Sequence, residues 1–212
     1  MSDTGTLVYV VDDDVSAREG VARLICSAGL TAKTFASGEE FLAAARSKTP
    51  GCLILDVNLP GLNGLDLQEE IAESDAEVPI IFLTGYGDIP MTVRAVQAGA
   101  ANFLTKPVDC EELLAAVRQA LERSRLVLAH ETEMKELRDC YASLTPRERE
   151  VMALVVSGLL NKQVGGELGI SEITVKAHRG QVMQKMKANS LADLVKMAGR
   201  LRLTERSAKQ TA

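Results

Sequence analysis

Short apolar runs alternate with stretches of helical spacing through the first half of the chain. The runs are rich in β-branched and aliphatic residues and predict strands at 7–11, 31–35, 52–55, 79–84 and 102–105. Between them, apolar residues recur at helical spacing, which predicts helices at 16–28, from Ser37, at 65–72, at 90–98 and from about Asp109. Strands and helices that alternate in this way pair in parallel through right-handed crossovers. We therefore predict a doubly wound α/β fold whose five-stranded parallel sheet has the order 2-1-3-4-5.

Polar residues mark the ends of some predicted helices. Ser16 with Glu19, and Ser37 with Glu40, have the spacing of capping boxes, in which each side chain satisfies a backbone N–H of the first turn. Gly29 suits the position after a helix end, where a left-handed backbone is common.

The second half of the chain carries helical patterns only. We predict an all-α module of four helices, which begin near Pro146, Asn161, Ser171 and Ser190 and end near 158, 168, 187 and 201. Thr145 caps the first helix, and Glu148 closes its capping box. A tight turn at Gly169 and Ile170 joins the second helix to the third, which is the arrangement of a helix-turn-helix.

Helical spacing also continues across the middle of the chain, from Asp109 to about residue 142. Leu114, Leu121 and Leu128 repeat at intervals of seven, although the heptads are imperfect. We favour one long helix that is able to pair with its twin in a second copy. A fifth helix followed by a flexible linker is the alternative.

Charge divides the chain at the same place. Residues 1–125 hold 10 Lys and Arg against 19 Asp and Glu, a net charge of −9, whereas residues 126–212 hold 14 against 10, a net charge of +4. The basic second half indicates a polyanionic partner. The four cysteines are far apart without a CxxC pair, which predicts reduced thiols rather than a zinc site or disulfides. The absence of a signal peptide and of a long apolar run predicts a cytoplasmic protein with no membrane partner.

Polar side chains follow several of the predicted strands. Asp12 and Asp13 come after the first strand and Asp56 after the third, and these two strands are neighbours in the predicted order. Three carboxylates at one edge repel, so either a pKa rises or a divalent cation binds, and Mg²⁺ fits best. Thr84 and Lys106, which end the fourth and fifth strands, add a hydroxyl and an ammonium group. This set predicts phosphoryl transfer to Asp56, with Mg²⁺ and Lys106 neutralising the phosphoryl oxygens.

Residues 5–124 resemble the receiver domain of two-component response regulators. The matching residues are Asp12-Asp13, Asp56, Thr84 and Lys106-Pro107. The resemblance implies a flavodoxin-like fold and a partner histidine kinase that phosphorylates Asp56. The segment Gly85–Met91 resembles the FixJ branch, where His is usual at the position of Tyr86.

The same resemblance assigns further roles around the acids. It implies Mg²⁺ held by Asp13, by Asp12 through water, by Asp56 and by the backbone carbonyl of Asn58. It also implies a cis Lys106–Pro107 bond and a switch role for Phe103, at a position that more often holds Tyr or Phe. A strand residue packing on the fourth helix is the plainer interpretation of Phe103, and both can hold in different states.

The third helix of the second half has two unlike faces. Val175, Val182, Met183 and Met186 lie on one face, which predicts that it packs on the core. On the opposite face Lys176 could read guanine edges, with the small Ala177 and Gly180 allowing close approach to a groove. Flanking residues could hold phosphates; these are Thr174, His178, Arg179, Gln181 and Lys185. A solvated basic face explains this pattern equally well when the helix is considered alone.

Residues 144–203 resemble the LuxR/NarL-type DNA-binding domain. The motifs are Leu144–Val151, Asn161–Val164 and Leu168–His178, and the helix-turn-helix at 161–180 adds Asn161 and Lys162 to the predicted DNA contacts. One departure is the Gly165-Gly166 pair, where the family tends to have Ala at the first position. Two helical glycines soften a helix, although Gly165 could serve close packing.

The two resemblances indicate a response regulator of the FixJ/NarL type, with a receiver at 5–124, a helical linker at 125–142 and a LuxR-type domain at 143–205. Such a protein is a transcription factor whose phosphorylation controls dimerisation and DNA binding. It is not otherwise an enzyme, because its receiver catalyses only its own phosphorylation and dephosphorylation. The implied partners are a histidine kinase, double-stranded promoter DNA, RNA polymerase and a second copy of the chain.

The alternative is an aspartyl-phosphate enzyme, such as a phosphatase, with a helical appendage. Hydrolysis would need a second acid or base beside the nucleophile. The two histidines of the chain, His130 and His178, both lie far from Asp56 in the sequence.

Overall fold

The chain divides into two compact units, Met1–His130 and Glu131–Ala212. The computed structural model describes residues 5–44, 49–73, 78–85 and 89–201. Tyr86, whose position usually holds His in the FixJ branch, lies outside these described residues.

The first unit is built on a five-stranded parallel sheet with the order β2-β1-β3-β4-β5. Its strands are β1 (Leu7–Val11), β2 (Thr31–Phe35), β3 (Gly51–Leu55), β4 (Ile80–Thr84) and β5 (Asn102–Thr105). All four pairings between neighbouring strands are parallel. The predicted sheet and its order are confirmed.

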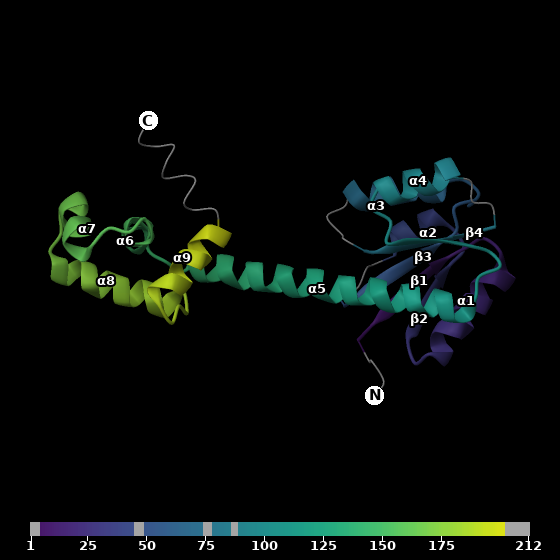
Figure 1. Cartoon of the computed structure of the whole chain (residues 1–212), viewed down its shortest axis with the longest axis horizontal. Coiled ribbons are helices and arrows are strands. Elements are labelled where there is room, and N and C mark those ends of the chain that lie inside the picture. The colour runs from purple at the N-terminus through teal and green to yellow at the C-terminus, as the bar shows by residue number, and fades with distance from the viewer. Residues whose placement is uncertain (1–4, 45–48, 74–77, 86–88, 202–212) are drawn as a thin grey trace. The chain divides into compact units, whose positions relative to one another are not determined.

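Helices cover both faces of this sheet (Figure 1). They are α1 (Val15–Ser27), α2 (Gly38–Ala43), α3 (Gly64–Glu73), α4 (Ile89–Gln97) and α5 (Cys110–Ala142). One core cluster joins the sheet to α2, α3 and α4 around Phe41, Leu67 and Phe82. A second joins the other face to α1 and α5 around Ile25 and Val117. Because both faces are covered, β3 and β4 are buried along their whole length.

Two of the predicted caps differ from the structure. The N-cap of α1 is Asp14, whose carboxylate accepts hydrogen bonds from the N–H groups of Ser16 and Ala17, so the predicted Ser16 box is wrong. Ser37 does cap α2, but the Glu40 carboxylate accepts from the N–H of Ala36. In both places a carboxylate, that of Asp14 or of Glu40, accepts hydrogen bonds from the backbone N–H groups that lie nearest to it. Gly29 adopts a left-handed φ of 79° after α1, as predicted.

The described part of the second unit holds the four predicted helices. They are α6 (Pro146–Val156), α7 (Asn161–Leu168), α8 (Glu172–Lys185) and α9 (Leu191–Arg200). Thr145 and Glu148 form the predicted capping box at the start of α6. Gly169 ends α7 with a left-handed φ of 65°, which turns the chain into α8.

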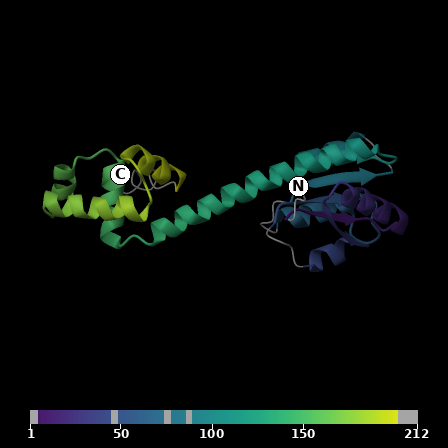
Figure 2. The same cartoon turned by 90° about the horizontal axis from the view of Figure 1, so that it is seen from below.

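The middle of the chain is a single helix, α5, of 33 residues (Figures 1 and 2). The predicted long helix is therefore present, and its pairing with a second copy stays a prediction. One face of α5, up to Ser124, is buried in the first unit, where the Ser124 hydroxyl accepts a hydrogen bond from the N–H of Gly51 at 3.1 Å. From Met134 onward, α5 packs within the second unit, and Leu137 is part of its core.

Gly165 provides the close packing that its position suggested. It is buried in α7, and a Cβ there would lie 2.7 Å from the carbonyl oxygen of Ile170. Gly166 is exposed, and a Cβ there would meet no described atom within 4 Å. Close packing against the turn into α8 therefore leaves no room for a side chain at Gly165, whereas Gly166 has room for one.

Replacing Gly166 by Ala is expected to raise the free energy of unfolding of the second unit by about 0.5–1 kcal/mol, because Ala costs less than Gly in a helix interior. Gly165→Ala is the matched control, since the same gain is opposed by the contact with Ile170. Thermal melts measure both. Equal stabilisation by the two changes would contradict the close packing at Gly165.

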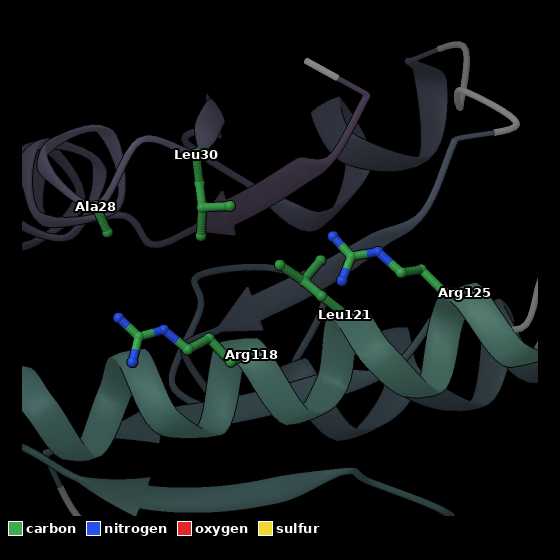
Figure 3. Close-up of a pocket in the computed structure, with 5 residues that line it drawn as sticks. All are labelled: Ala28, Leu30, Arg118, Leu121 and Arg125. Carbon is green, nitrogen blue, oxygen red and sulfur yellow. The ribbon is translucent and has the colours of Figure 1, made fainter. Parts of the chain in front are cut away.

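A small cavity of about 200 Å³ lies in the first unit, lined by Ala28, Leu30, Arg118, Leu121 and Arg125 (Figure 3). It sits between the end of α1, the start of β2 and α5. This is the amino edge of the sheet, opposite the edge at which the acidic residues gather.

None of the helices in the described part of the chain is long and apolar enough to cross a membrane.

Candidate functional site

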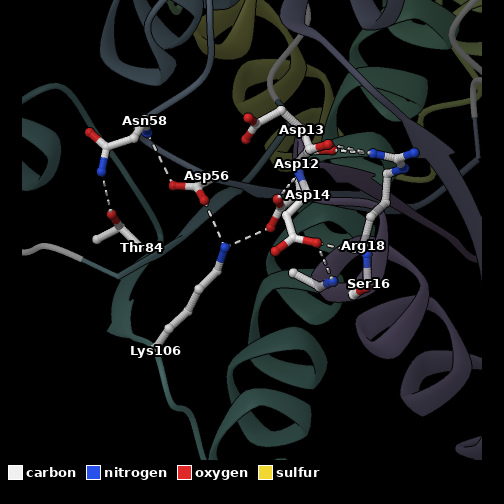
Figure 4. Close-up of polar contacts among 10 residues, drawn as sticks. Asp12, Asp13, Asp14, Ser16, Arg18, Asp56, Asn58, Thr84 and Lys106 are labelled. Atoms are coloured by element: carbon white, nitrogen blue, oxygen red, sulfur yellow. Dashed lines mark hydrogen bonds and ion pairs between the residues drawn. The ribbon is translucent and has the colours of Figure 1, made fainter.

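The three predicted acids meet at the carboxyl edge of the sheet (Figure 4). Asp12 and Asp13 follow β1 and Asp56 follows β3, and the register pairs the last residues of these two strands. One carboxylate oxygen from each acid lies within 4.8 Å of the others. Asp12 and Asp56 are only 4% and 8% exposed, whereas Asp13 faces solvent. The sheet thus brings three negative charges together, with one of them open to a ligand.

Lys106 stands between two of these acids. Its Nζ lies 2.7 Å from Asp12 Oδ2 and 2.7 Å from Asp56 Oδ2. Burial lowers the pKa of the ammonium, but the hydrogen bonds that it donates to the two carboxylates outweigh this effect, so the pKa of Lys106 is raised. Burial raises the pKa of Asp12 despite its pairing with Lys106. The following Lys106–Pro107 bond is cis, as the resemblance implied.

The second oxygen of Asp56 is fixed by the loop that follows β3. Asp56 Oδ1 accepts a hydrogen bond from the backbone N–H of Asn58 at 3.0 Å. The Asn58 side-chain amide donates to Thr84 Oγ1 at 3.4 Å, which links the loop to the end of β4. Gly64 permits this loop to fold back, because a Cβ there would lie 2.5 Å from the Asp56 carbonyl oxygen.

Two residues that sequence reasoning missed hold the acid pair in place. Asp14 donates its backbone N–H to Asp12 Oδ1 at 2.9 Å while its own carboxylate caps α1. The Arg18 guanidinium donates to the carbonyl of Asp12 at 2.5 Å and to that of Asp13 at 3.4 Å (Figure 4). The sequence did carry a signal for these two roles: Asp14 is the third consecutive acid, and Arg18 follows it one turn into the predicted helix.

The donor set fits a hard divalent cation. The set consists of carboxylate oxygens from Asp12, Asp13 and Asp56, and no nitrogen or sulfur atom belongs to the cluster found among the described residues. Cations of this kind prefer oxygen and commonly take one or two carboxylates with water and phosphoryl oxygens. The exposed Asp13 leaves such a cation accessible from solvent.

Phe103 lies on the face of the sheet that carries α4. Its ring is half-buried and packs against Phe82 with ring centroids 6.0 Å apart. The register pairs these two residues across β4 and β5, and the two-residue period of a strand puts the Thr84 side chain on the same face. The structure therefore places Thr84 and Phe103 as neighbours on the same face of the sheet, and Thr84 is fully buried there.

In the second unit, α8 is oriented as predicted. Val175, Val182 and Met186 are buried, and Met183 packs against the same core. The exposed residues on the other side are Lys176, Ala177, Gly180 and Gln181. Thr174, His178, Arg179 and Lys185, the predicted flanking residues, are half-buried.

Several of the predicted DNA contacts already have partners within the unit. Arg179 donates to Asn161 Oδ1 at 3.1 Å, which ties the start of α7 to the middle of α8. Lys176 pairs with Glu172 one turn away at 3.1 Å, and both side chains are well exposed. Exposed pairs of this type contribute little, so a DNA base can compete for the ammonium. Lys162 is exposed in the first turn of α7.

Lys185 has a structural role that its position on α8 did not indicate. Its Nζ lies 2.7 Å from Glu148 Oε2, and the Glu148 side chain is only 7% exposed. The same carboxylate accepts from the N–H of Thr145 at 2.8 Å. The hydrogen bond from Lys185, assisted by that from Thr145, lowers the pKa of Glu148. Lys185 thus fastens α8 to the start of α6, whatever it contributes to DNA binding.

Replacing Lys185 by Ala is expected to lower the melting temperature of the second unit by roughly 4–8 °C, because Glu148 loses its cation and stays buried. Lys196→Ala, at an exposed position on α9, is the control and should change little. Since the pKa of Glu148 is lowered from 4.5, its contribution is present above pH 4.5 and is lost as the pH falls through the folded value. Thermal melts at a series of pH values should show the melting temperatures of the wild type and Lys185→Ala converging as the pH falls below 4.5. A difference that stays constant with pH would contradict the pairing of Lys185 with Glu148.

Family models match both units of the chain. The model of the response regulator receiver domain matches residues 8–118, and that of the bacterial regulatory proteins of the luxR family matches residues 142–198. Together with the acidic site and the helix-turn-helix, these matches define the class: the chain belongs to the response regulators that join a receiver domain to a LuxR-type DNA-binding domain.

Similar proteins cover nearly all of the chain. Nodulation protein W of Bradyrhizobium diazoefficiens is 48% identical over 98% of this chain and 92% of its own length. Transcriptional regulatory protein FixJ of Azorhizobium caulinodans is 43% identical over 90% of each chain. The solved structure of the response regulator StyR is 44% identical, with a TM-score of 0.86 over 92% of this chain and 99% of that one. These similarities support a transcriptional regulator and give no support to the phosphatase-like alternative.

Proposed function

We propose that this transcriptional response regulator accepts a phosphoryl group on Asp56 from a histidine kinase and thereby controls its own dimerisation and its binding to specific DNA. The observation that carries the proposal is the position of Lys106, whose Nζ lies 2.7 Å from both Asp12 and Asp56. A nucleophilic carboxylate, a neighbouring acid pair and a cation at one sheet edge are the parts that phosphoryl transfer requires.

In the proposed reaction, an oxygen of the Asp56 carboxylate attacks phosphorus. The bond between phosphorus and the histidine nitrogen of the donor breaks, the nitrogen keeps the electron pair, and an acyl phosphate forms on Asp56. Lys106 is already bonded to Asp56 Oδ2 and offsets the charge of the incoming oxygens. The Asn58 N–H holds the other carboxylate oxygen, which fixes the direction of attack.

The acid cluster is proposed to hold Mg²⁺ through Asp13, Asp56 and the backbone carbonyl of Asn58, with Asp12 acting through water. When bound, Mg²⁺ supplies positive charge that neutralises phosphoryl oxygens. Asp12 and Asp13 bring the negative charge that such a cation needs, and Arg18 holds their backbone carbonyls in place.

The signal is proposed to pass from Asp56 to the surface of α4 and β5 through Thr84 and Phe103. Thr84 receives a hydrogen bond from Asn58, beside the phosphoryl acceptor. A phosphoryl group that draws the Thr84 hydroxyl inward would leave room for Phe103 to turn from its present place against Phe82. This change would reshape the surface on which two receivers pair.

The DNA-binding part of the proposal assigns α8 to the major groove, where Lys176 reads a base edge. The predicted contacts around it are Asn161, Lys162, Thr174, Ala177, His178, Arg179, Gly180, Gln181 and Lys185. One small helix-turn-helix reads few bases, so tight binding needs two copies on half-sites about one helical turn apart. We further propose a receiver at 5–124, a helical linker at 125–142 and a DNA-binding domain at 143–205, in a cytoplasmic protein that also contacts RNA polymerase.

A mobility-shift assay on DNA that the protein itself selects from a random pool tests the proposal. We expect binding to strengthen after treatment with acetyl phosphate and Mg²⁺. Failure to select any sequence would contradict the DNA-binding role, and indifference to acetyl phosphate would contradict its control by the receiver.

Lys176→Ala is expected to weaken specific binding by about 1–3 kcal/mol and to relax the preference at one base pair. Lys162→Ala is the matched comparison: its ammonium, in the first turn of α7, should contact phosphate, so its loss weakens binding to all sequences alike and lowers the salt slope by about one. Affinities on the selected operator, on its single-base variants and on unrelated DNA separate the two. The same specificity profile in both variants would show that base and phosphate contacts are wrongly sorted.

A further inference from the structure

Ile173 is the most exposed large hydrophobic residue of the described part of the chain. Ile173 is 79% exposed, although isoleucine is among the residues most often buried. It occupies the first turn of α8, two residues after the N-cap Ser171. Because it contributes almost nothing to the core, packing does not account for it.

The helical position of Ile173 is directly opposite the core. At about 100° per residue, Ile173 lies half a turn away from Val182, which is 1% exposed. Ala177 and Gly180, four and seven residues further on, fall on nearly the same line and are also exposed. Along this line Ile173 is therefore followed only by small residues, and it projects beyond them.

Neighbouring polar side chains in the same turn are engaged with the helix itself. The Ser171 hydroxyl accepts from the N–H of Thr174 at 3.1 Å and lies 2.8 Å from the Thr174 hydroxyl. Glu172 pairs with Lys176 at 3.1 Å. In the first turn of α8, the side chain left to meet a ligand in front of the helix is thus apolar.

We propose that Ile173 is a specificity-determining residue that reads the C5-methyl group of a thymine in the major groove. This inference rests on the proposed DNA-binding function and deepens it. The N-terminal residues of a recognition helix contact base edges, and thymine is the base that presents a methyl group there. An apolar branched side chain buries that methyl group, whereas it can offer no hydrogen bond to any other base edge.

The test removes the methyl group from DNA and the side chain from the protein separately. The full chain, activated with beryllofluoride, first selects an operator from random DNA. Each thymine of that operator is then replaced in turn by deoxyuridine, which lacks only the C5-methyl group, and affinities are measured by fluorescence anisotropy. For the wild type we expect one replacement in each half-site to weaken binding by roughly 3- to 10-fold, as the loss of one buried methyl contact implies.

The Ile173→Ala variant should bind the unmodified operator more weakly by a similar factor and should be insensitive to the same deoxyuridine. Ile173→Val keeps a branched apolar side chain and should retain most of the discrimination. Val195→Ala, at a 40% exposed position on α9, is the control and should reproduce the wild-type profile. Thermal melts of all three should match the wild type, because the changed residues are exposed.

Identical deoxyuridine profiles for wild type and Ile173→Ala would overturn the proposal, and so would a loss of affinity for every DNA alike, which would point to a contact with the backbone or with a protein. These outcomes differ from a failure of the underlying function. If the wild type selected no operator, DNA binding itself would be refuted, and the thymine contact with it.

Discussion

Asp56→Asn is expected to abolish phosphoryl transfer to the chain while leaving the first unit folded. The amide has the shape of the carboxylate but is not a nucleophile, so the bond to phosphorus cannot form. One charge of the acid cluster is also lost, which weakens the proposed Mg²⁺ site. Lys106 keeps its second partner, Asp12, and the Asn58 N–H keeps an oxygen acceptor at the same position.

Intact-protein mass spectrometry after treatment with acetyl phosphate and Mg²⁺ measures this effect. The wild type should gain one phosphoryl group, and Asp56→Asn none. Asp66→Asn is the matched control, because this exposed acid in the first turn of α3 is not part of the cluster. A phosphoryl group retained by Asp56→Asn in the receiver would show that another residue is the acceptor.

Phosphorylation is expected to convert a monomer into a dimer. Thr84 is fully buried beside Asn58, and Phe103 is only half-buried on the adjacent strand, so a change at the acid site can reach a surface within two side chains. A coupling of about 1–3 kcal/mol between the acceptor site and the dimer surface corresponds to a roughly 5- to 150-fold change in affinity.

Sedimentation velocity with and without beryllofluoride, a mimic of the phosphoryl group, tests the conversion. The wild type should sediment as a monomer without it and as a dimer with it, and Asp56→Asn should remain a monomer. A dimer in both states would move the switch into α5, whose continuous helix could then pair two chains. A monomer in both states would contradict dimerisation as the means of control.

The sheet and the acid site could be predicted because they depend on short-range patterns and on one topological rule. Apolar runs that end in polar residues place strand ends, and parallel pairing then brings Asp12, Asp56, Thr84 and Lys106 to one edge. The register of β1 with β3 and of β4 with β5 realises this arrangement. The capping box at Thr145 was predictable for the same reason, because all its partners lie within four residues.

What the sequence did not reveal depends on contacts between distant residues or on competition between neighbours. Lys185 and Glu148 are 37 residues apart, and only the packing of α8 on α6 brings them together. Gln68 lies on α3 but is buried, and its amide donates to the carbonyls of Ala95 and Ala98, so its polar character gave no sign of its burial. At the start of α1, Asp14 and Ser16 can both act as N-cap. The helix begins at Val15, so Asp14 is the N-cap and Ser16 lies inside the first turn.

The most direct test of the account is the affinity of the full chain for its selected operator, measured by fluorescence anisotropy with and without beryllofluoride, for the wild type and for Asp56→Asn. Beryllofluoride is expected to raise the wild-type affinity by roughly 5- to 150-fold and to leave that of Asp56→Asn unchanged. Equal wild-type affinities in the two conditions, or an equal response of Asp56→Asn, would contradict the control of DNA binding through Asp56.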